Sequence, residues 1–127
     1  MNIIYASGFG EIEFEVLKDI GGKSGFGGYV KITSDDVEKK ISDLKFKNPG
    51  SGSVLPVRIV LFETDNNKNA ITFINLFKSM NIPSAIFAVV TENNKEWSFK
   101  KLAGHLLKEH EEMLKKKSQN KNVKEKL

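Results

Sequence analysis

Hydrophobic and polar residues follow two different rhythms along the chain, and each predicts a different kind of element. Four short runs rich in apolar residues predict strands: Asn2–Ser7, Tyr29–Thr33, Val57–Glu63 and Ala85–Thr91. The last two are nearly continuous apolar stretches, which is typical of strands that are buried on both faces of a sheet. We therefore expect a sheet with both faces covered.

Between and after these strands, apolar residues recur at spacings of three and four, which predicts helices with one buried face. The expected helices cover Asp35–Leu44, Asn69–Met80 and Phe99–Leu114. Pro83 follows the second of these helices, where a proline commonly marks a helix end.

Residues 11–20 fit two patterns. Strict alternation from Glu11 to Val16 would suit a strand that forms a hairpin with residues 2–7, whereas Ile12, Val16, Leu17 and Ile20 form a helical stripe that Gly21-Gly22 would end. We favour the helix, because residues 3–44 and 59–114 then share the order strand, helix, strand, helix.

This order predicts a compact α/β domain with four largely parallel strands, and a duplicated βαβα unit is a hypothesis within it. Ile3–Tyr5 in the first half and Ile59–Leu61 in the second half occupy equivalent places in that order. The alternative is a ferredoxin-like βαββαβ core with added helices. The domain is expected to span residues 1–114, with halves 1–47 and 54–114, and to be followed by a lysine-rich tail, 115–127, that is frayed or disordered.

Composition narrows the class of protein. The 127 residues suffice for one domain, and 39% hydrophobic with 28% charged residues is typical of a soluble globular protein. Cysteine is absent, which excludes disulfides and thiolate chemistry. No apolar run approaches the roughly 20 residues that span a bilayer, and residues 2–6 lack the basic flank of a signal peptide. We expect a cytoplasmic protein that has no membrane partner.

The net charge of +4 is concentrated in one segment. Residues 113–127 hold six lysines and one glutamate, so the rest of the chain is close to neutral. Such a run is usually solvated, although lysines can also bind phosphates non-specifically. Arg58 is the sole arginine, and bidentate recognition of guanine favours arginine. Partners remain unknown; we expect at most weak, non-specific nucleic-acid contact through the tail and no specific recognition.

Glycine-rich and histidine-containing segments do not form a recognisable cofactor site. Gly21-Gly22-Lys23-Ser24 resembles the end of a phosphate loop, but Leu17 stands where that motif needs its first glycine. His105 and Glu109 are four residues apart on one helical face, which Glu112 extends, but a solvated face explains this pattern better than a metal site does. We predict no cofactor, no metal and no catalytic residue.

Two loops leave the carboxyl ends of buried strands, which is where open α/β sheets bind ligands. They carry the candidate ligand-binding residues: Glu63, Thr64, Asp65, Thr91, Asn94 and Trp97. Trp97 also has a structural alternative. Ser98 suits the N-cap of the following helix, and Trp97 before it is placed for a hydrophobic staple against Leu102.

The same region carries a family resemblance. Four short motifs stand out in it: Ala88-Val89-Val90-Thr91, Asn94, Trp97-Ser98-Phe99 and Glu109-His110-Glu111. With these motifs, residues 57–111 resemble a prokaryotic family, domain of unknown function 3783. That family has no established activity, so the resemblance implies a fold neighbourhood and no catalytic residues. The leading expectation is a small, non-catalytic binding or regulatory module. The alternative is a ligand- or nucleotide-dependent enzyme that uses the loops after residues 63 and 91.

Overall fold

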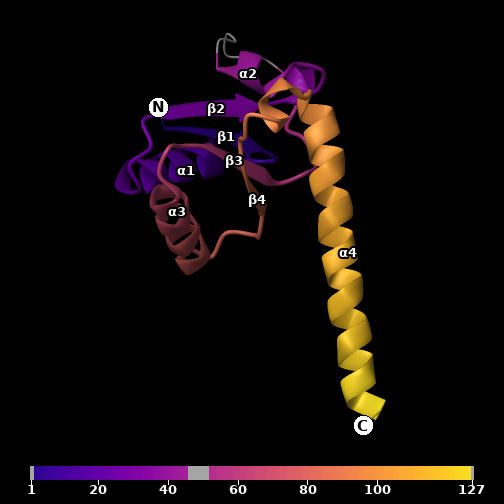
Figure 1. The fold of residues 1–127 in the computed structure, drawn as a ribbon. Helices are drawn as coiled ribbons and strands as arrows, with labels where there is room; N and C mark the ends of the chain where they lie inside the picture. Colours follow the sequence, from indigo (N-terminus) through magenta and orange to yellow (C-terminus); the bar gives the residue numbers. More distant parts are fainter. Residues whose placement is uncertain (1, 46–51, 127) are drawn as a thin grey trace.

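Four strands form a single mixed sheet in the order β2-β1-β3-β4 (Figure 1). The computed structural model describes residues 2–45 and 52–126. The central strands β1 (Ile3–Ser7) and β3 (Ile59–Glu63) are antiparallel, while β2 (Gly28–Ile32) runs parallel to β1 and β4 (Ile86–Val89) runs parallel to β3. All four predicted strands are therefore present.

The sheet is parallel within each half of the chain and antiparallel where the halves meet. The prediction of largely parallel strands is correct for two of the three strand pairs. It is wrong for the central pair, β1 and β3. Each crossover helix fixes the relative direction of the two strands that it connects, β1 with β2 or β3 with β4, but not the direction in which β3 pairs with β1. The ferredoxin-like alternative is wrong, since that fold splits each βαβ unit with another strand, whereas β1 and β2 are direct neighbours.

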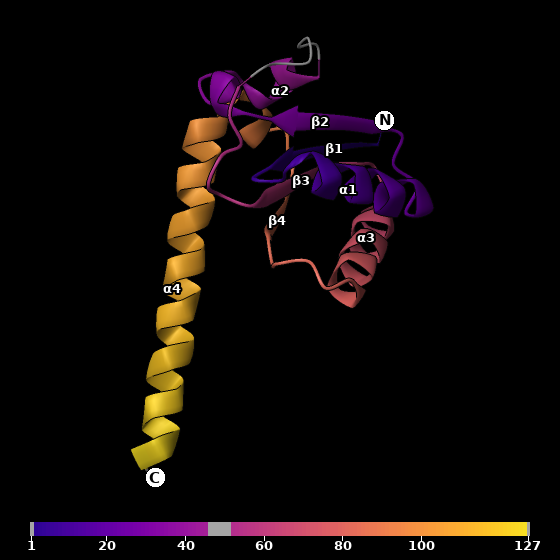
Figure 2. The same cartoon turned by 180° about the vertical axis from the view of Figure 1, so that it is seen from behind.

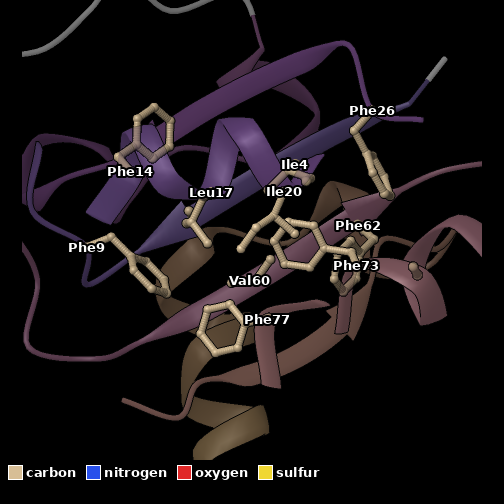
Figure 3. Packing of buried hydrophobic residues seen from close by; sticks show 12 residues of the cluster. Ile4, Phe9, Phe14, Leu17, Ile20, Phe26, Val60, Phe62, Phe73 and Phe77 are labelled. Atoms are coloured by element: carbon tan, nitrogen blue, oxygen red, sulfur yellow. The ribbon is translucent and has the colours of Figure 1, made fainter. Parts of the chain in front are cut away.

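Helices cover both faces of the sheet (Figures 1 and 2). Helices α1 (Glu11–Lys23) and α3 (Asn67–Ser79) bury apolar residues on one face, and α2 (Ile41–Leu44) and α4 (Phe99–Lys126) do so on the other. The first cluster is rich in phenylalanine, with Phe62 and Phe73 in edge contact at 5.2 Å between ring centres (Figure 3). Burial on both faces of β3 explains its continuous apolar sequence.

Residues 11–20 are helical, as expected, but glycine does not end the helix. Helix α1 continues through Gly21 and Gly22 to Lys23. The reason lies at Gly21, where a β-carbon would come within 2.6 Å of the Tyr29 ring. Glycine here permits close packing of α1 on β2 and does not serve as a stop.

The helix predicted over residues 35–44 is interrupted. A 3₁₀ turn covers Ser34–Asp36, and α2 begins only at Ile41. Here the backbone also pairs with a distant segment: Ile41 N donates to Trp97 O, and Phe99 N donates to Lys39 O, both at 3.0 Å. Sequence periodicity cannot reveal this competition, because the partner segment lies in the other half of the chain.

Helix α4 is longer than predicted. Its backbone continues from Phe99 through the lysine-rich segment to Lys126, and the ribbon extends well past the sheet (Figure 1). Its first turns pack against the sheet through Leu102 and Ala103, whereas every side chain from Lys108 to Lys115 is exposed. The sheet therefore supports only the beginning of this helix.

The first strand and first helix of each half match in length, and the two parallel strand pairs have the same register. Adding 56 to the residue numbers of β1 and α1 gives the bounds of β3 and α3. The first residue of β2 lies opposite the first residue of β1, and β4 is aligned with β3 in the same way. After these strands, Thr33 N donates to Asp36 and Thr91 N donates to Asn94, both at 2.8 Å.

Candidate functional site

A hollow of about 390 Å³ lies where the parallel strands β3 and β4 end. Four of the predicted site residues line it together: Glu63, Thr64, Asp65 and Thr91. The remaining lining residues are Lys45, Val90, Glu92 and Lys95. The size lies within the usual range of ligand sites, roughly 300–1,000 Å³, and the position agrees with the rule for carboxyl ends of strands.

Glu63 is the most firmly placed polar group of this hollow. The fully buried Tyr5 hydroxyl donates to Glu63 Oε1 at 2.9 Å, and Lys45 Nζ is 3.9 Å from Oε2. Burial, and then the hydrogen bond and charge of Glu63, raise the pKa of Tyr5 well above its ordinary value. Tyr5 therefore stays a neutral donor at physiological pH and fixes the carboxylate as an oriented acceptor.

Thr64 shapes the turn that leads from β3 into α3. Its hydroxyl donates to Asn2 Oδ1 at 2.7 Å and accepts from Asn66 N at 3.1 Å. Asn66 in turn caps α3, since its side-chain oxygen accepts from Lys68 N at 3.0 Å. Through these bonds the turn that forms this wall of the hollow is anchored to the amino end of α3.

The other wall carries opposite charges. Lys95 Nζ is 2.7 Å from Glu92 Oε2, and this partner raises the pKa of Lys95. Both side chains are solvent-accessible, so the pair is easily rearranged. Among the described lining residues, three carboxylates (Glu63, Asp65 and Glu92) stand against two ammonium groups (Lys45 and Lys95).

Asn94 and Trp97 do not line the hollow. Asn94 locks the turn that follows β4: its side chain accepts from Thr91 N and donates to Val89 O at 3.1 Å. Trp97 packs in the apolar cluster under α4, with the His105 ring 5.4 Å away. Ser98 caps α4 as predicted, because its hydroxyl accepts from Lys101 N at 3.1 Å.

Sequence reasoning missed four polar residues of this region. Glu92 and Lys95 neighbour Thr91 and belong to the same loop, so the loop signal itself would have included them. Tyr5 and Lys45 carry no such signal. They reach Glu63 from β1 and from the end of α2, both of which belong to the first half of the chain.

The opposite end of the sheet, where β1 and β2 end, is covered by residues 52–57. Ser34 N donates to Ser53 O at 3.0 Å, Thr33 forms an antiparallel bridge with Val54, and Ser7 Oγ donates to Val57 O at 2.8 Å. Thr33 is consequently only 3% exposed. Thr91, at the end of β4, is exposed.

A second hollow, of about 360 Å³, lies beside α4 at the amino ends of β3 and β4 and is lined in part by Arg58. The Arg58 guanidinium donates to Gly8 O and Pro83 O and stacks on Phe9, 4.1 Å from the ring centre. It also bonds Glu13, at 3.2 Å to Oε1 and 3.1 Å to Oε2, which lowers the pKa of that carboxyl. This arginine thus ties three chain segments together, which is a structural role.

Metal and membrane tests give plain results for residues 2–45 and 52–126. Among the side chains of residues 2–45 and 52–115, no three histidines, aspartates or glutamates come together in a way that would hold a metal ion. None of the helices in these ranges is both long and apolar enough to cross a membrane.

Fold and site define the class: a small α/β protein of two parallel βαβ pairs joined antiparallel, with a polar hollow at the end of the second pair. Residues 58–113 match the family model described as Domain of unknown function (DUF3783). This match confirms the resemblance predicted for residues 57–111. No curated protein and no solved structure matches the chain.

Proposed function

We propose that this protein is a non-catalytic binding module whose ligand occupies the hollow at the ends of β3 and β4. The observation that carries the proposal is the arrangement of Glu63, which a buried tyrosine holds in place at the mouth of a polar hollow. A pre-oriented acceptor costs little entropy when it binds, which is a property of recognition sites.

We also infer that the chain is a duplicated βαβα unit. One constant shift in numbering relates β1 to β3 and α1 to α3, which supports this inference, as do the matching Thr33–Asp36 and Thr91–Asn94 hydrogen bonds. A bridge between Lys40 and Ser98 supports it further. The shift in residue numbers that aligns β2 with β4 also aligns Lys40 with Ser98, so the two residues are equivalent positions in the two halves. A bridge between equivalent positions would lie on the two-fold axis that relates the halves.

Duplication explains why one site is expected and not two. Residues 52–57 cover the end of the first strand pair, whereas the end of the second pair is open. The open end also lies in residues 58–113, the part that matches the family model.

Thermal-shift screening against nucleotides, amino acids, sugars and short peptides tests the proposal. A ligand present at about 100 times its Kd should stabilise the native state by about 2.7 kcal/mol. We expect Glu63→Gln and Thr91→Val to remove this stabilisation, whereas Glu38→Gln, an exposed change outside the hollow, should keep it. Ligands that stabilise all variants equally would contradict the site.

The same hits distinguish binding from catalysis. Incubation of each stabilising compound with the protein, followed by NMR of the compound, should show it unchanged. Conversion that Glu63→Gln abolishes would establish the enzyme alternative at these loops and overturn the non-catalytic proposal.

A further inference from the structure

We infer that the ligand of this hollow is an extended peptide that places a basic side chain on Glu63. The inference rests on the proposed function, because it concerns the same hollow and names its ligand class. Its starting point is that the chain already seats an extended segment of its own at the corresponding place in the first half.

The correspondence follows from the bounds and registers of the strands. Ser7 ends β1 as Glu63 ends β3, and the alignment of β2 with β1 and of β4 with β3 carries Thr33 to Thr91. Both threonines have the same local structure, since the N–H of each donates to a side-chain oxygen three residues later. Glu92 then corresponds to Ser34.

Residues 52–57 show how the first of these sites recognises a peptide. Ser34 N donates to Ser53 O, and Ser34 Oγ accepts from Ser53 N at 2.9 Å. The segment fits closely, because a β-carbon on Gly52 would come within 2.5 Å of Thr33 Oγ1. Main-chain groups supply the contacts, which is how strand addition binds extended peptides of varied sequence.

The second site offers the same main-chain positions to solvent. Thr91 and Glu92 are exposed, and within residues 2–45 and 52–126 no segment bridges Thr91 as Val54 bridges Thr33. A peptide from another molecule therefore has room to run along Thr91 and Glu92.

Two substitutions between the halves determine which peptide fits. Ser7 donates its hydroxyl to a carbonyl of the covering segment, but Glu63 in its place only accepts. Gly8 lets that segment come very close, whereas Thr64 in its place carries a side chain. The peptide backbone therefore turns away near Thr64, and Glu63 is free to accept from a donor side chain of the peptide.

The charge of the hollow favours that cation. Among the described residues that line the hollow, Glu63, Asp65 and Glu92 outnumber Lys45 and Lys95, and the Lys45 ammonium is 3.9 Å from Glu63. A lysine or arginine of the ligand can form a shorter charge-assisted bond with the oriented carboxylate.

The test uses two end-blocked, labelled hexapeptides and the full chain. One copies residues 52–57, Gly-Ser-Val-Leu-Pro-Val, and the other ends in lysine in place of this valine, because Val57 is the residue that meets Ser7. Fluorescence anisotropy should show about tenfold tighter binding of the lysine peptide, the preference expected from one charge-assisted contact. Glu63→Gln should remove the preference.

A matched pair of variants tests the main-chain contact. Glu92→Pro removes the N–H that corresponds to that of Ser34, and proline suits the second position of this turn. Glu92→Ala removes the same carboxylate but keeps the N–H. We expect Glu92→Pro to bind the lysine peptide about tenfold more weakly than Glu92→Ala does, with unchanged melting temperatures showing that both fold.

Failure has two distinguishable forms. If the lysine peptide does not bind at about 1 mM, or binds equally to all variants, the peptide inference is wrong. If a small molecule then stabilises the chain in a manner that depends on Glu63, the proposed binding site stands with a different ligand. If neither binds, both proposals fall.

Discussion

Replacing Tyr5 with phenylalanine tests the hydrogen bond that orients Glu63. The side chain is completely buried, and its hydroxyl donates to Glu63 Oε1 at 2.9 Å. A hydrogen bond to a charged group contributes roughly 1.5–3 kcal/mol, and partial exposure of Glu63 lets water replace some of this. We expect Tyr5→Phe to lower the free energy of unfolding at pH 7 by about 1–2 kcal/mol.

The same substitution should become harmless in alkali. Burial raises the pKa of Tyr5 in the folded state above the ordinary value of 10.0 that applies in the unfolded state. The stabilisation is therefore complete below pH 10 and is lost as the pH rises toward the folded-state pKa. At pH 11 the wild type should have lost about 1.4 kcal/mol that the phenylalanine variant cannot lose.

Urea unfolding followed by the fluorescence of Trp97 provides the measurement at pH 7, 9, 10 and 11. Tyr29 and the lysines are the same in both proteins, so the difference between the two proteins isolates Tyr5. A difference that stays constant from pH 7 to pH 11 would refute the reasoning, since it would mean that Tyr5 ionises normally. In Glu63→Gln the alkaline loss should persist, because burial is the larger cause of the shift.

Three further predictions concern stability. Gly8→Ala should lower the free energy of unfolding by about 1–3 kcal/mol or more, because φ is +84° and a β-carbon would collide with the Val57 carbonyl. Gly10→Ala, where a β-carbon meets open space, should lower it by less than about 1 kcal/mol. Chemical denaturation of both variants measures the difference. Trp97→Ala should cost about 1–4 kcal/mol by the same assay, and a neutral result would show that it does not pack under α4. Deletion of 115–127 should change the melting temperature by at most about 2 °C, and a cooperative loss of several degrees would show that this segment docks on the domain.

Sequence patterns specified the elements better than their arrangement. The apolar runs around β3 and β4 and the helical stripes of α1, α3 and α4 are local signals, and they predicted the correct element type. The antiparallel joint between β1 and β3 is not local, because a strand buried on both faces has the same apolar pattern in either direction. Periodicity alone predicts a helix through residues 37–40, because their pairing with residues 98–100 leaves no trace in their own pattern.

The same difference between local and non-local signals decides which residues of the candidate site were predictable. Glu63, Thr64, Asp65 and Thr91 were predictable because a general rule places ligands where parallel strands end. Trp97 was a candidate because it belongs to the loop that follows β4, yet its position before an N-cap directs it against the apolar cluster under α4. Tyr5, which orients Glu63, was unpredictable because an apolar strand gives no sign of which hydroxyl meets a carboxylate.

The central position of β1 has a consequence during protein synthesis. Tyr5 lies opposite Leu61 in the antiparallel joint, so the second edge of β1 stays unpaired until β3 has been made. At a synthesis rate of about 5–20 residues per second, the stretch from Tyr5 to Leu61 takes roughly 3–11 s. During that interval β1 and β2 can pair, but an apolar strand edge of the nascent chain remains open to other nascent chains. The ribosome-bound first half is therefore the form of this protein that is most prone to aggregate, and the form to which we expect chaperones to bind.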